Sequence, residues 1–477
     1  MEVLDKLKEK CGVFGIFGHA EAANIAYLGL HALQHRGQES AGITTSDGTR
    51  IYRYGQMGLV NDIFTPEVIE RLPGTIAIGH NRYSTSGQSI PENIQPLAVQ
   101  NSRGAVALSH NGNIVNAQEI REELEERGAI FQSSSDTEII IHLMARSRGS
   151  NEIDRLIEAL HQVRGAYSLL ILSEKRLIAV RDPRGFRPLS MGRLGDAWVF
   201  TSETCSLDLI EADFVRDVSP GEVVVVDRNG VSSFFPFPKM KASPCIFEYI
   251  YFARPDSVID GLSVYEVRKR LGAKLAEESP ADADVVVPVP DSGVPAALGY
   301  AQRLDLPLEW GLIRNHYVGR TFIEPSQSIR HFGVKLKLNP AGEAIRGKRV
   351  VLIDDSIVRG TTSRKIVKMI RAAGAREVHL RISSPPAKSP CFYGIDTPSH
   401  QELIASSHTV DEIRNYVTAD SIGYLSLEGM RWAVQRDQSL ETASFCEACF
   451  SGHYPVSFPR KDESQMDFWF PSGVFNV

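Results

Sequence analysis

The sequence predicts a two-domain protein, with an α+β layered domain first and an α/β domain built on a parallel sheet second. Up to about residue 230 the chain has many short strand-like stretches and two helical ones, near residues 21–34 and 116–127. Beyond residue 260 it has short continuous apolar runs, which are typical of strands buried on both faces. Between the two parts, "FFPFPKMKASP" (234–244) carries three prolines and is typical of a linker. A chain of 477 residues is also too long for one hydrophobic core.

Composition and charge exclude several classes of function. A net charge of −6 argues against a general nucleic-acid binder, which is usually basic. No apolar run approaches the ~20 residues that span a bilayer, and the first ten residues lack the apolar core of a secretory signal. We therefore expect a cytoplasmic protein with neither a membrane nor a nucleic-acid partner. Disulfides are rare in that compartment, so packing, catalysis or metal binding must account for the six cysteines.

The first domain contains strands that pair locally and few helices, a pattern typical of an α+β layered fold. In the second helical stretch, Ile120 and Leu124 share one face of an otherwise polar segment. The predicted strands lie within "GVFGIFG" (12–18), "TIAIGHNRYS" (75–84), "AVALSHNGNIV" (105–115), "AYSLLILSEKRLIAV" (166–180) and "EVVVVDRNG" (222–230).

The second domain follows a strand–helix–strand order. The runs "ADVVVPVPDSG" (283–293) and "GKRVVLIDDS" (347–356) predict two buried strands. The second run leads into a helix with Ile366, Met369 and Ile370 on one face, and Gly374 ends that helix. Because "EVHLRISS" (377–384) supplies the next strand, this part predicts a βαβ unit in a parallel sheet.

The stretch "VVLIDDSIVRGTTS" (350–363) predicts a phosphate-binding loop. Open α/β sheets bind ligands where such strands end, and the helix N-terminus there favours a phosphate. Asp354 and Asp355 would repel that phosphate, so we expect them to face sugar hydroxyls or a Mg²⁺ ion. An acidic turn with a hydroxyl N-cap would account for one Thr or Ser, but not for two acids, Gly360 and three hydroxyls in order.

This stretch resembles the phosphoribosyl pyrophosphate (PRPP) signature of type I phosphoribosyltransferases. The resemblance implies that Asp354 and Asp355 meet the ribose hydroxyls and the Mg²⁺ site. Upstream, "PVPDSGVP" (288–295) is similar to the pyrophosphate loop of that fold, with Ser292 near the metal, although "DSG" alone predicts only a turn. The residues implied to hold the 5-phosphate through their backbone are Val358, Arg359, Gly360, Thr361, Thr362 and Ser363.

A basic stretch (314–340) lies between the two loops and includes Lys335 and Lys337. Such a run of charges is often only a solvated loop. Its position here favours a lid that closes over an anionic substrate and excludes water.

The first domain opens with "KLKEKCGVFGIFG" (6–18), in which Cys11 follows ten mostly charged residues. Cys11 could be a small hydrophobic residue of a strand, but the charged decapeptide then has no explanation. Polar clusters elsewhere each allow a structural explanation: Arg82 as a surface charge, Asn111–Gly112 as a hairpin turn, and Asp136 or a neighbouring Ser as a helix N-cap.

Taken together, Cys11 and these clusters resemble the αββα N-terminal-nucleophile glutamine amidotransferase domain, whose cysteine begins the mature chain. The resemblance implies a propeptide (1–10), an amidotransferase domain (11–235) and a phosphoribosyltransferase domain (245–477). The chemistry agrees, because a free α-amino group with a pKa near 7.8 can deprotonate the thiol. While Lys10 and Cys11 remain joined, that nitrogen is an amide and cannot act as a base.

The same resemblance assigns roles in the glutamine pocket. Arg82 is expected to bind the glutamine carboxylate, and Asp136 its α-ammonium group. Asn111 and the Gly112 N–H are expected to form the oxyanion hole. Arg36 and Thr85 are expected to complete the pocket.

From Cys11 to beyond Cys449 the chain resembles the glutamine–PRPP amidotransferase family. The resemblance implies that Cys11 forms a thioester with glutamine and releases ammonia, which displaces pyrophosphate from PRPP to give 5-phosphoribosylamine, in the first committed step of purine synthesis. Ammonia must be shielded from water, and "FEYIYFARPDS" (247–257) is aromatic enough to line a passage, or is ordinary interdomain core. The family also implies a homotetramer inhibited by purine nucleotides.

Three alternatives remain less consistent with the sequence. A hexosamine synthase would share the glutaminase domain but not the PRPP loop. A regulatory PRPP-binding protein would not need Cys11 or the pair Arg82 and Asp136. An iron–sulfur electron-transfer protein would have no use for the PRPP loop.

The remaining cysteines suggest a metal site. "CEAC" (446–449) is a CxxC pair, which alone could bind a metal, be redox-active or arise by chance. One branch of the family carries a [4Fe–4S] cluster, and this sequence has cysteines at all four implied places: Cys245, Cys391, Cys446 and Cys449. Zinc is the strongest competitor for four thiolates. We expect the cluster to hold the fold together rather than carry electrons, and Cys205 to be a packed strand thiol.

Overall fold

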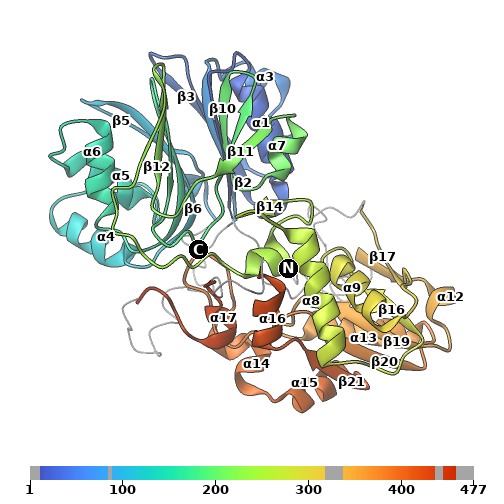
Figure 1. The fold of residues 1–477 in the computed structure, drawn as a ribbon. Coiled ribbons are helices and arrows are strands. Elements are labelled where there is room, and N and C mark those ends of the chain that lie inside the picture. Colours follow the sequence, from blue (N-terminus) through green and yellow to red (C-terminus); the bar gives the residue numbers. More distant parts are fainter. Residues whose placement is uncertain (1–10, 84–88, 317–336, 436–443, 458–477) are drawn as a thin grey trace, which may run out of the picture. The chain divides into compact units, whose positions relative to one another are not determined.

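The computed structural model describes residues 11–83, 89–316, 337–435 and 444–457, and the chain divides into two units (Figure 1). The N-terminal unit contains residues 11–244, Cys391–Ser399 and 454–457. The C-terminal unit contains Cys245–Pro390 and His400–His453. Residues 1–10, Thr85 and Lys335, for which the sequence makes predictions, lie outside the described residues.

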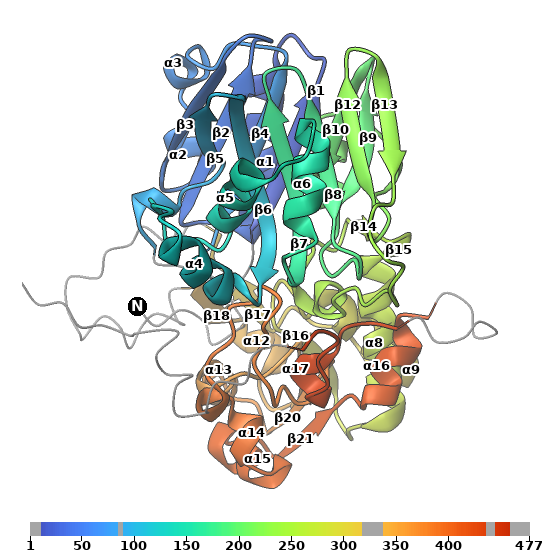
Figure 2. The same ribbon diagram turned by 90° about the vertical axis from the view of Figure 1, so that its left-hand side faces the viewer.

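Two antiparallel sheets form the middle of the N-terminal unit (Figure 2). Seven strands make the first sheet, in the order β11 (Asp213–Asp217), β9 (Ser190–Leu194), β10 (Ala197–Thr201), β1 (Gly12–Phe17), β4 (Ile76–Arg82), β2 (Ser40–Ser46) and β3 (Ile51–Met57). Six make the second, in the order β13 (Gly230–Phe234), β12 (Val223–Asp227), β8 (Leu177–Arg181), β7 (Gly165–Ser173), β6 (Gly104–Ile114) and β5 (Leu97–Asn101).

Successive side chains of a strand point to opposite faces of its sheet, so each sheet contributes to two hydrophobic cores. On β1, Phe14 and Ile16 face a core shared with α1 (Ala22–Ala32) and α7 (Cys205–Leu209), whereas Val13 faces a core between the sheets. The second sheet packs its other face against α4 (Ala117–Glu126), α5 (Glu138–Arg146) and α6 (Glu152–Leu160). Figure 1 shows these helices on the outer sides of the two sheets. The predicted αββα arrangement is therefore confirmed, with Ile120 and Leu124 buried as expected.

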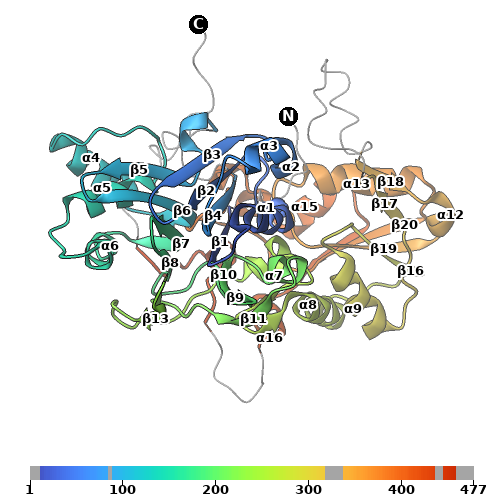
Figure 3. The same ribbon diagram turned by 90° about the horizontal axis from the view of Figure 1, so that it is seen from above.

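The C-terminal unit is built on the predicted parallel sheet. Its strands follow the order β16 (Val285–Pro288), β19 (Arg349–Asp354), β20 (Glu377–Ile382) and β21 (Ser421–Tyr424), and each neighbouring pair is parallel. Figure 3 shows α8 (Val264–Glu278) and α9 (Val294–Leu304) on one side of this sheet and α13 (Thr361–Ala372) on the other. Shorter helices include α12 (Gly342–Ile345), α14 (Ile404–Ser407), α15 (Val410–Val417), α16 (Leu427–Ala433) and α17 (Ala448–Ser451).

One segment belongs to a different unit from the one its place in the sequence suggests. The sequence predicts a single boundary near residues 235–245, which would assign Cys391–Ser399 to the second domain. In the structure this segment packs within the N-terminal unit, where Tyr393 stacks on Phe186 with ring centroids 4.4 Å apart. Among the described residues, no helix combines the length and the apolar character needed to cross a membrane.

Candidate active sites

Cys11 lies directly before β1, an inner strand of the N-terminal unit's first sheet. Because β1 pairs with β4 so that Gly12 faces Asn81, Cys11 comes beside the end of β4, where Arg82 lies. The side chain is 8% exposed, and its Sγ donates to the Tyr83 carbonyl oxygen at 3.7 Å. Burial raises the pKa of the thiol above its ordinary value, and Arg82 partly opposes this effect. With its nitrogen in a peptide bond, Cys11 is therefore a protonated, sheltered thiol.

Arg82 is not the surface charge that the sequence allowed as an alternative. It is 3% exposed, and β2 pairs with β4 so that Ser40 faces Arg82. The guanidinium Nη1 lies 3.8 Å from a carboxylate oxygen of Glu39. A buried, permanently charged side chain near a thiol suits the binding of a carboxylate.

Arg36 forms an ion pair that the sequence did not predict. Its Nη1 lies 3.0 Å from Glu203 Oε1, and His35 Nε2 lies 2.8 Å from the same oxygen. Arg36 and Glu203 are both fully buried, so this pair fixes the loop before β2 to the segment after β10. Glu203 stands in "TSETCS" (201–206), which has no feature that would have singled it out.

Asn111 and Gly112 lie inside β6, opposite Ser168 and Tyr167 of β7, so the hairpin-turn alternative is wrong. Asn111 is fully buried, and among the described residues neither its Oδ1 nor its Nδ2 has a hydrogen-bond partner. Leaving a buried amide unsatisfied costs about 1–3 kcal/mol, so such a group usually serves a ligand. Gly112 has φ +152°, and a Cβ there would lie 2.0 Å from the Ala166 carbonyl oxygen. Only glycine fits.

Asp136 binds the backbone of β6 instead of capping a helix. Its Oδ2 accepts from the Ile114 N–H at 2.9 Å, two residues beyond Gly112. The N-cap of α5 is Thr137, with no side-chain capping bond, so Asp136 does not have the capping role that the sequence allowed as an alternative. Burial disfavours the charged carboxyl, but His110 and the hydrogen bonds hold its pKa below the ordinary value. Asp136 is thus a buried carboxylate that can meet an ammonium group.

Two histidines missed by the sequence reasoning join the sheets beside these residues. The His80 ring donates from Nε2 to the His110 carbonyl oxygen at 3.0 Å. Burial lowers the pKa of His80 to about 3, so the ring is neutral. Gln95 accepts the His110 N–H at 2.7 Å and donates to Thr137 at 3.0 Å. A His-Asn pair follows an apolar stretch twice, in "GHN" and "SHN", and that repetition was the available signal.

In the C-terminal unit, the two predicted loops meet at one edge of the sheet. Strands β16 and β19 pair with Pro288 beside Ile353, so their carboxyl ends lie together. Asp354 and Asp355 are 2% and 1% exposed. Asp355 Oδ2 accepts a hydrogen bond from Ser292 Oγ, and its Oδ1 accepts one from Ser356 Oγ at 2.6 Å.

The predicted phosphate loop leads into α13. Gly360, with φ +76°, is the N-cap, and Thr361 is the exposed first residue of the helix, with Thr362 and Ser363 buried behind it. The Val358 carbonyl oxygen accepts from the Ile404 N–H at 2.9 Å. The Arg359 guanidinium pairs with Glu402 at 2.8 Å, so a phosphate would meet this loop's backbone and hydroxyls.

The ends of the basic stretch are held together. Strand β17 (Leu312–Arg314) pairs antiparallel with β18 (Leu338–Pro340), and the Asn315 N–H donates to the Lys337 carbonyl oxygen at 2.9 Å. Lys337 is half-buried beside this ladder. The lid remains a prediction, because residues 317–336, which include Lys335, lie outside the described part.

The described residues contain no preformed metal site, but they include two buried carboxylates that could serve Mg²⁺. Within the described ranges, no three His, Cys, Asp or Glu side chains are grouped closely enough to hold a metal ion by themselves. Mg²⁺ does not require such a group, since it commonly uses one or two carboxylates, water and substrate phosphates. Asp354 and Asp355 supply suitable oxygens.

The structure does not assemble the predicted cluster site: all four predicted cysteine ligands are described, and no three of them are grouped to hold a metal ion. All six are described and carry thiols rather than disulfides. Cys245 and Cys446 form a parallel β-bridge, and the Lys388 and Ser389 N–H groups donate to the Cys449 carbonyl oxygen. Cys391 accepts the Tyr393 N–H on its sulfur at 3.3 Å. Cys205 is packed as expected, but it begins the helix α7 and does not lie in a strand.

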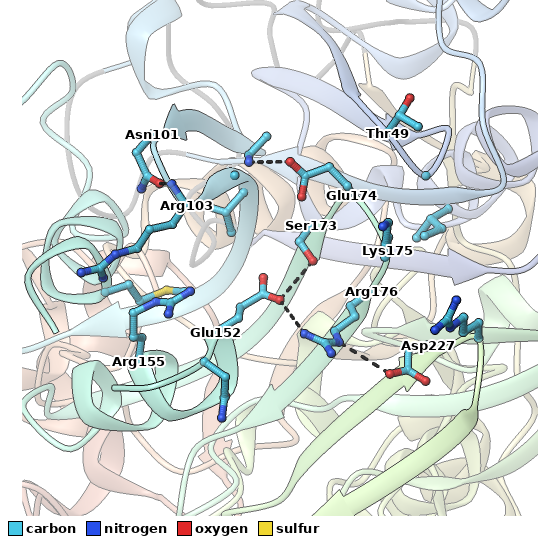
Figure 4. Close-up of a pocket in the computed structure, with 18 of the residues that line it drawn as sticks. Thr49, Asn101, Arg103, Glu152, Arg155, Ser173, Glu174, Lys175, Arg176 and Asp227 are labelled. Carbon is cyan, nitrogen blue, oxygen red and sulfur yellow. Dashed lines mark hydrogen bonds and ion pairs between the residues drawn. The ribbon is translucent and has the colours of Figure 1, made fainter. Parts of the chain in front are cut away.

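A separate cavity of about 920 Å³ lies at the other end of the N-terminal unit's second sheet (Figure 4). Glu152 accepts from Ser173 at 3.2 Å and lies 3.5 Å from Arg176, which also faces Asp227 at 3.6 Å. The residues that line this cavity include Gly104, the first residue of β6. Asn111 lies seven residues further along the same strand, which is roughly 24 Å at the rise of an extended strand. No predicted site residue lines this cavity.

Two family models match the chain, one within each unit. A family model described as "Glutamine amidotransferase domain" matches residues 80–208. A second, described as "Phosphoribosyl transferase domain", matches residues 260–384. The first contains Arg82, Asn111 and Asp136, and the second contains both PRPP loops.

Similar proteins cover nearly the whole chain. "Amidophosphoribosyltransferase 2, chloroplastic" of Arabidopsis thaliana is 53% identical, over 99% of this chain and 85% of its own. "Amidophosphoribosyltransferase" of Rhizobium etli is 53% identical, over 97% of this chain and 95% of its own length. A solved structure, glutamine phosphoribosylpyrophosphate amidotransferase from B. subtilis complexed with ADP and GMP, matches with a TM-score of 0.90 and 50% identity, over 94% of this chain and 98% of its own. The chain therefore belongs to the amidophosphoribosyltransferase family.

Proposed function

We propose that this chain transfers the amide nitrogen of glutamine to C1 of PRPP, releasing glutamate and pyrophosphate and forming 5-phosphoribosylamine for purine synthesis. The observation that carries the proposal is the meeting of two loops at the edge of one parallel sheet, where Ser292 donates to Asp355. The same chain carries a buried thiol beside a buried arginine, Cys11 and Arg82. Family membership supports the pairing of these two sites in one reaction.

In the glutamine half-reaction, Cys11 is the nucleophile. Once residues 1–10 are removed, its own α-amino group takes the thiol proton, and sulfur attacks the amide carbon. Asn111 Nδ2 and the Gly112 N–H stabilise the oxyanion, which collapses to a thioester and ammonia. Water then hydrolyses the thioester to glutamate.

Recognition of glutamine follows from the buried charges near the nucleophile. Arg82 binds the α-carboxylate and Asp136 binds the α-ammonium group, so the substrate's own zwitterion is matched. Arg36 acts through its ion pair with Glu203, which fixes the pocket wall. Thr85 completes the pocket.

In the PRPP half-reaction, the residues of the C-terminal unit bind and orient the substrate. The backbone of residues 358–363 receives the 5-phosphate, and Asp354 and Asp355 face the ribose hydroxyls. Asp354, Asp355 and Ser292 would hold a Mg²⁺ ion, which would neutralise charge on the pyrophosphate leaving group. Lys335 and Lys337 belong to the lid that excludes water while ammonia attacks C1.

A [4Fe–4S] cluster held by Cys245, Cys391, Cys446 and Cys449 is a separate part of the proposal. The β-bridge between Cys245 and Cys446 and the N–H donor to the Cys391 sulfur support it. The amidotransfer moves no electrons, so the cluster would join distant segments and stabilise the fold. Zinc is the competing occupant.

Regulation, assembly and location are also inferred. The B. subtilis relative was solved with ADP and GMP, which supports feedback by purine nucleotides. A homotetramer and a cytoplasmic location follow from the family resemblance, although several relatives are chloroplastic.

The deciding experiment measures glutamate formation and pyrophosphate release in one preparation. We expect pyrophosphate release to require PRPP and to proceed with either glutamine or ammonia. Glutamine hydrolysis without any PRPP-dependent pyrophosphate release would contradict the proposed function.

A further inference from the structure

The oxyanion strand is in contact with a segment some 280 residues further along the chain. Within the N-terminal unit, the segment Cys391–Ser399 lies against the end of β6 that carries Asn111 and Gly112. The Asn113 side chain donates from Nδ2 to the Phe392 carbonyl oxygen at 2.9 Å. This bond fixes the residue that follows Gly112.

Within this segment, Gly394 lies directly against the backbone of Gly112. It has φ +94°, and a Cβ placed on it would lie 2.6 Å from the Gly112 carbonyl carbon, 2.7 Å from its oxygen and 3.0 Å from its Cα. A Cβ on Gly112 itself would meet the Ala166 carbonyl oxygen of β7 at 2.0 Å. The α-carbon and carbonyl of Gly112 therefore have close backbone neighbours in both β7 and Gly394, which leaves no space for a larger residue at position 112 or position 394.

The segment is itself firmly held. Tyr393 is 2% exposed and stacks on Phe186, with the ring planes 24° apart. Its carbonyl oxygen accepts from Arg187 Nε at 3.3 Å, and its hydroxyl donates to the Val456 carbonyl oxygen at 2.7 Å. Arg187 is fully buried. These contacts lie one residue from Gly394, so the backbone that touches Gly112 is well fixed.

We propose that Gly394 and the Phe392 carbonyl are positioning groups that hold the Gly112 N–H and the Asn111 amide in the geometry of the oxyanion hole. The inference rests on the proposed role of Asn111 and Gly112. Oxyanion donors act only when they are aimed at the position that the charged oxygen will occupy, and a misplacement of about 1 Å can cost 100-fold. The family resemblance assigned Cys391 to a cluster and gave no role to its neighbours.

Gly394→Ala tests the contact, and Gly48→Ala is its matched control. Gly48 has φ +92°, but a Cβ there meets nothing within 4 Å, so the control carries the same backbone strain without the clash. For Gly394→Ala we expect kcat with glutamine to fall about tenfold or more, because removal of a whole oxyanion donor costs about 10²–10³. We expect an unchanged KM for glutamine and an unchanged ammonia-dependent rate. Gly48→Ala should leave all three values unchanged.

A transition-state mimic distinguishes a misplaced oxyanion hole from a general loss of structure in the variant. The Cys11 thiol adds across the aldehyde of glutamate γ-semialdehyde, forming a C–S bond while the thiol proton passes to the carbonyl oxygen, and the adduct's oxygen occupies the oxyanion hole. Its inhibition constant should rise in Gly394→Ala by about the factor by which kcat falls, whereas that of glutamate should not change.

Asn113→Ala keeps the proposal testable if Gly394→Ala does not fold, because it removes only the bond to Phe392. As in Gly394→Ala, kcat with glutamine should fall and the inhibition constant of the aldehyde should rise. Glutamine kinetics for Gly394→Ala or Asn113→Ala within twofold of the Gly48→Ala control would overturn the inference. Asn111→Ala tests the underlying role: if it retains full glutamine activity, the assignment of the oxyanion hole itself fails.

Discussion

Ser292 Oγ donates a hydrogen bond to Asp355 Oδ2, across two loops that leave neighbouring parallel strands. The two residues are 63 positions apart in sequence, and the register of β16 and β19 brings them together. Both belong to segments that resemble PRPP-binding loops, so this bond is where the sequence prediction and the structure agree most specifically.

Replacing both Asp354 and Asp355 with Asn should weaken the use of PRPP with either nitrogen source. Loss of groups that hold a metal or its ligands commonly costs 10–100-fold in affinity, so we expect at least a tenfold rise in KM for PRPP. Basal glutaminase should survive. The control is Asp305→Asn, an exposed residue that ends α9 at φ +53°, where Asn is well tolerated. Unchanged PRPP kinetics in the double variant would show that the loop is wrongly assigned.

Asp136→Asn should impair glutamine binding. The amide can still accept the Ile114 N–H, but it no longer supplies a charge for the substrate ammonium group. Hydrogen bonds to charged groups contribute about 1.5–3 kcal/mol, so KM for glutamine should rise about 10–100-fold while the ammonia-dependent rate stays constant. The control is Asp62→Asn, which removes one charge from an exposed residue of α2 (Val60–Ile63) outside the predicted glutamine pocket. Equal KM values in the two variants would count against the role of Asp136.

Glu138→Gln should reduce stability in a pH-dependent way. Glu138 accepts the N–H groups of Gln132 and Ser133 at 2.8 and 2.7 Å, and so shapes the loop before Asp136. Burial opposes its ionisation, yet His142 and these N–H groups lower its pKa from 4.5 to about 2. A lowered pKa means that the stabilisation is complete above about pH 4.5 and is lost as the pH falls toward 2.

Melting temperatures measured from pH 7 to pH 2.5 check this prediction. The difference between the unmodified chain and Glu138→Gln should be largest near neutrality and should shrink below pH 4.5. Glu126→Gln, at the exposed end of α4, controls for the loss of one charge. A difference that is constant with pH would refute the linkage.

Cys446→Ser should give poorly folded protein with little bound iron. Protein purified without oxygen should be brown, with about four iron and four sulfide per chain if the cluster is [4Fe–4S]. Cys205→Ser is the control, because Cys205 is equally buried but lies outside the ligand set. Stoichiometric zinc with no visible absorption would replace the iron–sulfur proposal with a zinc site.

Local patterns predicted most of the fold. Alternation and continuous apolar runs indicated the strands, and Ile120, Leu124 and Ile366 are buried as their helical spacing predicts. Local patterns could not assign Cys391–Ser399 to the N-terminal unit, because that placement depends on Phe186, Asn113 and Gly112, some 200–280 residues earlier. Such pairings leave no periodic signal in a single sequence.

The site was predicted as a set of residues but not as a network. Asp136 and Arg82 were named, whereas Glu203, His80 and Gln95 were not. These three act by holding other residues, and buried polar residues of this kind have no motif of their own. Arg36 illustrates the limit: the resemblance named it, and only the structure reveals its ion pair with Glu203.

One chain holds two sites, and only the glutamine site requires Cys11. The most direct measurement is the rate of PRPP-dependent pyrophosphate release by Cys11→Ser, first with glutamine and then with ammonia as the nitrogen source. We predict no activity with glutamine and an unchanged rate with ammonia, because the residues that bind PRPP are untouched. Retained activity with glutamine, or loss of both activities in a folded variant, would contradict the account.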